Sequence, residues 1–237
     1  MLEGSVVVIT GSAGGIGRYV AKTFAQERAR VVVADIKPLD EVSAELEAME
    51  VDHLAITTDV RDENSARNLI ERTVERFGRI DVLHNNAAIV PHFQWGLRQW
   101  PRIRDLDFSF WNNVVQTILG GTFLCTKYAL AQMEAQRSGH IINTMGGSQV
   151  AHAYAVSKDA VLSFTRFVAR EEREFNICAV AIGPGARIAT EEAPEEARAR
   201  MPGVASVGNR FVLAAQASME MSGHLLDVTD GKLVVRS

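Results

Sequence analysis

A predicted strand, a glycine-rich turn and the start of a predicted helix open this chain, and this succession constrains the fold more than any other feature. Residues 6–9 form a short apolar, β-branched run that is typical of a buried strand. Thr10 and Gly11 end the run, Gly15 and Gly17 follow, and helical spacing begins directly after them. A helix N-terminus offers unpaired N–H groups, and glycines let a ligand come close to the backbone. The stretch therefore predicts a binding site for an anion such as a pyrophosphate.

Apolar runs alternate with helical stretches along the whole chain, which indicates βαβ units and a parallel sheet covered on both faces. The predicted strands are residues 6–9, 31–34, 54–57, 80–84, 140–143, 177–182 and 225–228. The predicted helices are residues 18–28, 39–49, 63–77, 110–137, 154–174 and 206–219. We therefore predict an α/β fold in which residues 1–237 form a single doubly wound domain of the Rossmann type, with a mostly parallel seven-stranded sheet.

Charge and composition argue against several classes of protein. The net charge is −4 with both signs scattered, so we expect no nucleic acid partner. The two cysteines, Cys125 and Cys178, belong to no Cys/His cluster, which predicts buried thiols and neither a metal site nor a disulfide. The N-terminus has no signal-peptide pattern, and no run approaches the ~20 apolar residues of a membrane span. These features predict a cytoplasmic protein that does not cross a membrane.

Asp35 ends the second predicted strand and lies 18 residues past Gly17. A carboxylate about 20 residues beyond such glycines receives the adenine-ribose hydroxyls of a dinucleotide. Because it repels a 2′-phosphate, Asp35 favours NAD over NADP, although Lys37 nearby moderates that preference. The alternative is that Asp35 only caps the next helix.

The spacing Thr10-Gly-x-x-x-Gly-x-Gly17 resembles the glycine motif of the short-chain dehydrogenase/reductase family, classical type. Further motifs follow in that family's order: Asp59-Val60, Asn85-Asn-Ala-Ala88, Tyr154-x-x-x-Lys158 and Gly183-Pro-Gly185. The resemblance covers essentially the whole chain. It implies hydride transfer between NAD and a small alcohol or carbonyl substrate. The cofactor-binding positions that it implies are Gly11, Ser12, Gly15, Ile16, Gly17, Asp35, Ile36, Asp59, Val60, Asn86, Ala87, Tyr154, Lys158, Pro184 and Gly185.

Tyr154 and Lys158 are the catalytic pair that the resemblance implies. Residues four apart share one face of a helix, so the phenol and the ammonium can meet. A nearby cation favours the phenolate, and Tyr154 could then take a proton from an alcohol or give one to a carbonyl. By resemblance, Lys158 also holds the nicotinamide ribose. The alternative is a core tyrosine and a surface lysine at accidental spacing.

Two positions depart from the family's catalytic pattern. Met145 and Gly146 stand where two serines are common, so Ser148 is the candidate for the serine's role, against a plain loop serine. Ile118 stands where the family has a catalytic asparagine, and its side chain can neither donate nor accept a hydrogen bond. Asn113 lies on a different helical face. These departures leave open a catalytically impaired, NAD-binding family member with a structural or sensing role.

Two segments are candidates for the substrate region. By resemblance, residues about 183–210 form a substrate loop, with one residue more than usual before Thr190. Residues 91–104 are rich in tryptophan and arginine, and they either line the substrate site or pack on the protein itself. His152 either lines the pocket or is structural. The two long helices are expected, by resemblance, to form the interface of a homodimer or homotetramer.

Overall fold

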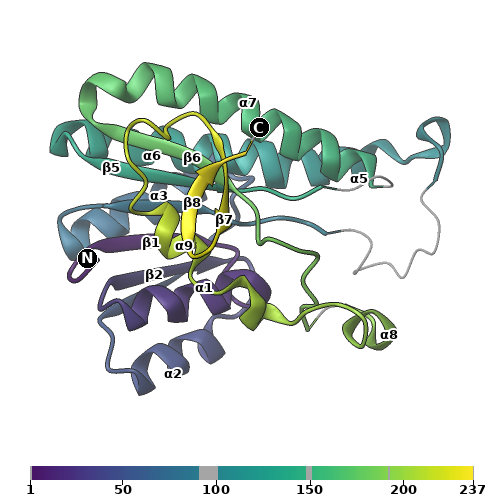
Figure 1. The fold of residues 1–237 in the computed structure, drawn as a ribbon, viewed down its shortest axis with the longest axis horizontal. Helices are drawn as coiled ribbons and strands as arrows, with labels where there is room; N and C mark the ends of the chain where they lie inside the picture. The colour runs from purple at the N-terminus through teal and green to yellow at the C-terminus, as the bar shows by residue number, and fades with distance from the viewer. Residues whose placement is uncertain (1, 91–100, 148–150, 192, 237) are drawn as a thin grey trace.

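A computed structural model of the protein describes residues 2–90, 101–147, 151–191 and 193–236, and Figure 1 shows its fold. The described strands are β1 (Val6–Thr10), β2 (Arg30–Asp35), β3 (His53–Thr57), β4 (Val82–Asn85), β5 (Gly139–Thr144), β6 (Ile177–Ile182), β7 (Leu225–Thr229) and β8 (Lys232–Val235). The described α-helices are α1 (Gly15–Gln26), α2 (Asp40–Ala48), α3 (Glu63–Phe77), α5 (Phe108–Val115), α6 (Gly121–Gln136), α7 (His152–Glu171), α8 (Glu195–Arg198) and α9 (Arg210–Ala214).

The strands form one sheet in the order β3-β2-β1-β4-β5-β6-β7-β8. All neighbours run parallel except β7 and β8. The chain therefore winds outward from β1 in one direction and from β4 in the other, which confirms the predicted doubly wound α/β fold. This reversal between β1 and β4 is where such sheets bind ligands, outside the carboxyl ends of the strands.

The eighth strand is a difference from the seven-stranded prediction. β7 and β8 form a hairpin across Asp230 and Gly231, and both residues have positive φ angles, 50° and 71°. An Asp-Gly pair with two positive φ angles is the signature of a tight hairpin turn. The sequence therefore carried signals for this strand in the Asp-Gly pair and in the apolar run Leu233–Val235, although the strand is short and mostly exposed.

Two apolar layers cover the sheet, because successive strand residues point to opposite faces. Val7 and Ile9 of β1 pack in one core cluster with α1, α2 and α9. Val6 and Val8 pack in the other with α3, α6 and α7. The central strand β1 is thus buried on both faces, as its continuous β-branched sequence predicts.

The predicted helix over residues 110–137 is interrupted. A π-helical turn, Gln116–Gly120, joins α5 to α6. A Cβ at Gly121 would lie 2.6 Å from the Val60 side chain, so this glycine permits the close approach of α6 to the end of β3. By length and composition alone, the stretch Phe108–Gln136 could cross a membrane. This stretch packs, however, against the helices α3 and α7 and against the strands β4 and β5. That is the position of a core helix.

Two further helices begin and end elsewhere than predicted. The predicted helix over residues 206–219 is instead a 3₁₀ turn, Val204–Val207, followed by α9. The predicted helix over residues 154–174 begins two residues earlier, at His152, and continues past Glu171 as a 3₁₀ turn. Tyr154 and Lys158 therefore lie in the first turns of α7, close to the carboxyl end of β5.

Candidate active site

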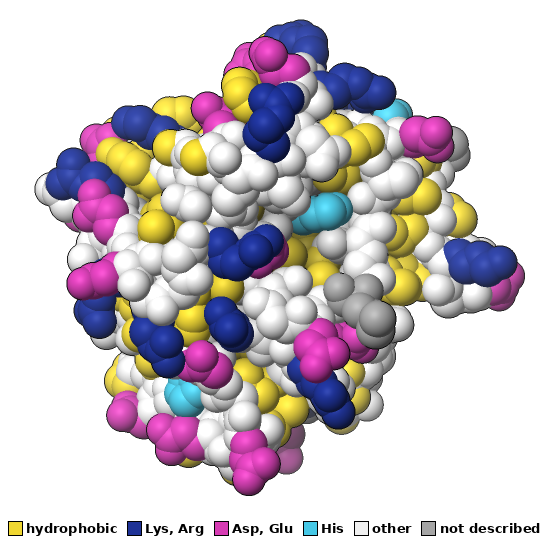
Figure 2. Space-filling model, turned by 90° about the vertical axis from the view of Figure 1, so that its left-hand side faces the viewer, with side chains coloured by type: hydrophobic (Ala, Val, Ile, Leu, Met, Phe, Trp, Pro, Cys, Tyr) yellow, Lys and Arg dark blue, Asp and Glu magenta, His cyan; other side chains and the backbone are white. Residues whose placement is uncertain are grey.

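A cavity of about 870 Å³ opens at the carboxyl ends of the central strands. Its lining joins the glycine turn before α1, the ends of β2 and β4, the first turns of α7 and the segment after β6. Of the predicted site residues, it includes Gly11, Gly15, Ile16, Gly17, Asp35, Ile36, Asp59, Val60, Asn86, Ala87, Tyr154, Lys158, Pro184 and Gly185. Figure 2 shows the side of the molecule away from the carboxyl ends of the strands, where cationic and anionic side chains are interspersed.

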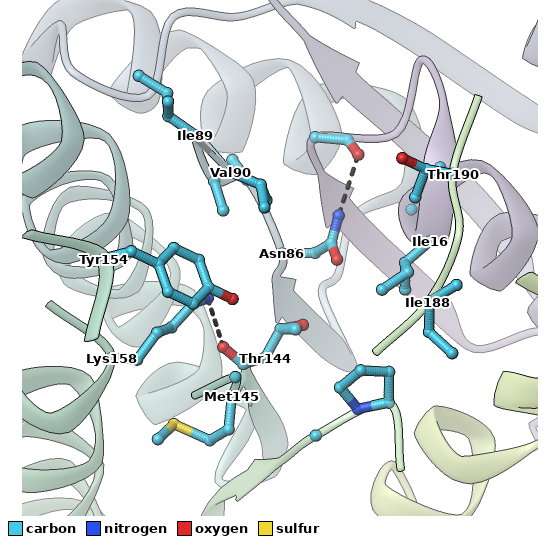
Figure 3. Close-up of a pocket in the computed structure, with 18 of the residues that line it drawn as sticks. Ile16, Asn86, Ile89, Val90, Thr144, Met145, Tyr154, Lys158, Ile188 and Thr190 are labelled. Atoms are coloured by element: carbon cyan, nitrogen blue, oxygen red, sulfur yellow. Dashed lines mark hydrogen bonds between the residues drawn. The ribbon is translucent and has the colours of Figure 1, made fainter. Parts of the chain in front are cut away.

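The glycine turn is held in shape from β4. The Asn86 side chain donates hydrogen bonds to the carbonyl oxygens of Thr10 and Gly11, each at 3.0 Å. In return, the Thr10 hydroxyl accepts from the backbone N–H groups of Asn86 and Ala87. A Cβ at Gly17 would overlap the Gly11 carbonyl oxygen, so glycine is required there by packing. Figure 3 shows Asn86 and its bond to the turn at the centre of the cavity.

Asp35 joins the end of β2 to this turn. One of its carboxylate oxygens accepts from the Ala13 N–H at 3.0 Å, and the other accepts from the Lys37 N–H at 3.0 Å. The next helix, α2, begins at Asp40, and Asp35 gives it no cap. The helix-capping alternative is therefore wrong.

Ser12, a predicted cofactor residue, points away from the cavity. Its hydroxyl is fully buried and bonds to the carbonyl oxygens of Ile9 and Ala34, while it accepts from the Ala34 N–H at 2.8 Å. This side chain ties the first two strands together, and the Ser12 N–H also donates to the Ala34 carbonyl oxygen at 3.3 Å, so both polar hydrogens of Ser12 are used within the fold.

Asp59 and Val60 line the cavity just after β3. Asp59 forms a two-pronged ion pair with Arg61, which lowers the pKa of the Asp59 carboxyl. Arg61 also donates to Asn113, so that asparagine is engaged here and does not replace the one missing at Ile118. Val60 is buried against Gly121. Ile36 is 57% exposed beside Asp35 and offers an apolar surface to a flat ring.

Tyr154 and Lys158 share one face of α7 and line the same cavity, as their spacing predicts (Figure 3). The Lys158 ammonium donates to the Thr144 carbonyl at 2.6 Å and lies 5.7 Å from the centre of the Tyr154 ring. Burial lowers the pKa of Lys158 to about 8 and raises the pKa of Tyr154 to about 12. At neutral pH the lysine is thus largely charged, and the tyrosine carries its proton.

Gly146, which by resemblance stands where the family commonly has a serine, lies against the Tyr154 hydroxyl. A Cβ at Gly146 would overlap Tyr154 Oη, so the absence of a side chain at Gly146 makes room for the phenol. Ser148, the predicted substitute, lies outside the described residues. The position of the family's asparagine is Ile118, which is buried in the π-helical turn and packs with Val114 and Met145.

His84 is a polar group of this region that the sequence analysis missed. It is completely buried near the end of β4. Its Nε2 lies 2.7 Å from the Thr144 hydroxyl, and its ring centre lies 4.5 Å from that of Phe211, with the two rings tilted. Desolvation and the neighbouring Lys158 lower its pKa to about 3. A histidine inside the apolar run 80–84 was the only sequence signal. Its partner Thr144 lines the cavity.

The segment after β6 closes the cavity from the other side. Gly185 has a φ of 88° and lies against the Arg210 guanidinium, which pairs with Asp227 at 2.5 Å. Further on, the Glu191 carboxylate accepts a hydrogen bond from the Gly15 N–H at 2.7 Å. No sequence pattern marks either contact, because the partners are far apart in the chain.

The remaining predictions for this region fall partly outside the described residues. Residues 91–100 are not described, so the proposed substrate wall stays a prediction. His152 Nε2 lies 3.3 Å from the Pro101 carbonyl oxygen, and its ring centre lies 6.3 Å from that of Trp111. Within the described ranges, no cluster of three or more His, Cys, Asp or Glu side chains could hold a metal ion.

The sequence profile of the short chain dehydrogenase family matches residues 5–200, so the chain belongs to this family. It is 37% identical to secoisolariciresinol dehydrogenase of Forsythia intermedia over 77% of this chain and 66% of that protein. It is 33% identical to the 3-oxoacyl-(acyl-carrier-protein) reductase FabG of Thermotoga maritima over 99% of both chains.

Solved structures agree with this assignment. A short-chain type dehydrogenase/reductase from Mycobacterium marinum matches with a TM-score of 0.84 and 27% identity, over 97% of this chain and 95% of that one. NAD⁺-bound xylitol dehydrogenase matches with a TM-score of 0.73 and 27% identity, over 84% and 75% of the two chains. The predicted resemblance is confirmed, and the protein is an oxidoreductase of this family.

Proposed function

We propose that the protein is an NAD-dependent oxidoreductase that transfers hydride between the nicotinamide and a small alcohol or ketone. The observation that carries the proposal is a single cavity that joins the glycine turn and Asp35 at one end to Tyr154 and Lys158 at the other. The NAD⁺-bound xylitol dehydrogenase among the similar structures supports the choice of cofactor. The enzyme names of the relatives favour catalysis over a purely structural or sensing role.

The residues present fit a dinucleotide. The turn before α1 has positive φ at Gly11 and Gly15, and its amides lie at a helix N-terminus, as a diphosphate site requires. Asp35 would accept the adenine-ribose hydroxyls, and the end of β3 with Asp59 and Val60 would hold the adenine. Pro184 and Gly185 would lie over the nicotinamide. The dinucleotide supplies the hydride acceptor or donor.

The chain's own contribution is the movement of a proton at Tyr154 Oη. Because the pKa of Tyr154 is raised to about 12, the phenol holds its proton at neutral pH and is set to donate it to a carbonyl. The reverse reaction, removal of a proton from an alcohol, needs a cation to stabilise the phenolate. Lys158 provides that cation from the next turn of α7.

The test is a panel of alcohols and ketones assayed with NAD(H) and NADP(H). We expect turnover with NAD(H), and a decrease of about 10²–10⁴-fold in kcat for Tyr154→Phe, the usual contribution of a general acid or base. Tyr128→Phe is the matched control, because Tyr128 is bonded to Glu63 on the surface between α3 and α6. Unchanged turnover in Tyr154→Phe contradicts the mechanism, and NAD binding without any turnover favours the sensing alternative.

Three further features of this enzyme are part of the proposal. Residues about 183–210 act as the substrate loop, and the protein works in the cytoplasm. It forms a homodimer or homotetramer through the outer faces of α6 and α7. Support for the interface comes from Phe123, Val156 and Phe167, large apolar side chains that are each about half exposed on these helices. Size-exclusion chromatography with light scattering tests it, and a monomer contradicts it.

A further inference from the structure

The N-terminus of α1 is capped by a residue from a distant part of the chain. Its own N-cap residue, Gly14, makes no side-chain hydrogen bond, and its first turn holds no acidic residue. By contrast, α3 and α5 are capped by Asp62 and Asp107, which immediately precede them. The cap of α1 is the carboxylate of Glu191, 176 residues further along the chain.

The Glu191 carboxylate contacts the glycine turn at Gly14 and Gly15. Its Oε1 accepts from the Gly15 N–H at 2.7 Å, and the same oxygen occupies the space that a Cβ at Gly14 would fill. An anionic oxygen at a helix N-terminus is stabilised by the unpaired amides and by the helix dipole. These are the groups that a cofactor diphosphate would use, and the Glu191 carboxylate already accepts from one of them, the Gly15 N–H.

The backbone around Glu191 is fixed rather than free. Ala189 pairs with Gly203 and donates to the Pro202 carbonyl. Ala193 is buried and donates to the Thr190 carbonyl. The Thr190 methyl would lie 3.2 Å from a Cβ at Gly15, so this segment rests on the turn (Figure 3). Displacement of the carboxylate therefore needs a rotation of the Glu191 side chain or a shift of the backbone from Ala189 to Glu191.

We infer that Glu191 is an internal anion that competes with the cofactor diphosphate for the N-terminus of α1. The inference rests on the proposed function, since it concerns the same cofactor site. The carboxylate caps α1 in the free protein and must leave when a diphosphate binds. Because Glu191 belongs to the segment that covers the cavity after β6, cofactor entry and the position of this segment are coupled. Glu191 thus weakens cofactor binding and sets the affinity of the site.

The experiment compares wild type, Glu191→Gln and Glu191→Ala with three probes: NADH, ADP and adenosine. ADP carries the diphosphate and adenosine does not. Both variants should bind NADH and ADP about 2- to 5-fold more tightly, the usual effect of one charge at a helix end, and adenosine with unchanged affinity. Glu75→Gln, which removes an exposed carboxylate from α3 outside the cavity, should bind all three like wild type.

The outcomes separate this inference from the proposed function. Equal or weaker ADP binding by both Glu191 variants overturns the inference, as does an equal gain for adenosine, which would indicate only a more open cavity. Tighter ADP binding by the variants, with no turnover on any alcohol or ketone, supports the inference and counts against the oxidoreductase. Glu191→Gln preserves the side-chain volume, and thermal unfolding monitored by circular dichroism verifies that each variant is folded.

Discussion

The two ends of the cavity are built by different means. At the cofactor end, backbone groups and positive φ angles define the site, and Asn86, Thr10 and Ser12 fix it through hydrogen bonds to the backbone. At the catalytic end, side chains define the site, and by the resemblance drawn from the sequence Gly146 and Ile118 stand where the family has polar side chains. A site built from backbone groups does not tolerate side chains at its glycines. A site built from side chains can lose polar groups while its backbone stays the same.

The π-helical turn illustrates the second half of this contrast. Gln116–Gly120 forms an irregular backbone around Ile118, the buried, apolar residue that by resemblance stands where the family has an asparagine. π-Helical turns are rare and are frequently found at functional sites. The irregular backbone is thus present here with an apolar side chain at its centre.

Among the changes that test this comparison through cofactor affinity, the largest effect should come from a Cβ at the cofactor end. In Gly17→Ala the new Cβ would overlap the Gly11 carbonyl oxygen, and it would also lie 2.7 Å from the Asn86 side-chain nitrogen, so it cannot shift in that direction. Strain of 1–3 kcal/mol is typical of such overpacking, so the affinity for NADH should fall by about 10- to 100-fold. Fluorescence titration measures it. Gly203→Ala, where nothing lies within 4 Å, is the control, and equal binding by both variants would break the comparison.

A smaller change is expected where the cofactor end uses a charge. Asp35→Asn keeps the shape that accepts from the Ala13 N–H but removes the repulsion of a 2′-phosphate. The ratio of NADP to NAD affinity should rise by about tenfold, which corresponds to ~1.4 kcal/mol. Titration of both cofactors measures the ratio. If wild type already prefers NADP, Asp35 does not have the role given to it.

The sequence predicted the features that depend on local pattern. The parallel strands, the glycine turn, Asp35 and the Tyr154–Lys158 spacing all follow from neighbours in the chain, and the structure brings them to one cavity. The sequence did not predict contacts between residues that are far apart in the chain. His84 meets Thr144 from the adjacent strand, Glu191 meets Gly15 across the cavity, and no local pattern marks either partner.

The catalytic end gives the next prediction, since restoring the family's serine should not help. In Gly146→Ser the new Cβ would overlap the Tyr154 hydroxyl and push the phenol off its position. Because small misplacements of a catalytic group are costly, kcat should fall by about tenfold. Gly147→Ser, where a Cβ meets nothing within 4 Å, should have little effect. A higher kcat in Gly146→Ser would mean that the catalytic end is impaired by its glycine.

The smallest effect concerns the buried histidine beneath the catalytic end. The pKa of His84 is about 3 in the folded protein and about 6.5 in an unfolded chain, so between these values the unfolded state binds more protons. Stability therefore falls as the pH falls below about 6.5. Wild type should lose about 0.8 kcal/mol more than His84→Val between pH 7.5 and 6, as measured by urea unfolding. The exposed His224→Gln should follow the wild-type curve. Parallel curves for wild type and His84→Val would show that His84 is not held neutral, and the catalytic end would then contain a second buried cation beside Lys158.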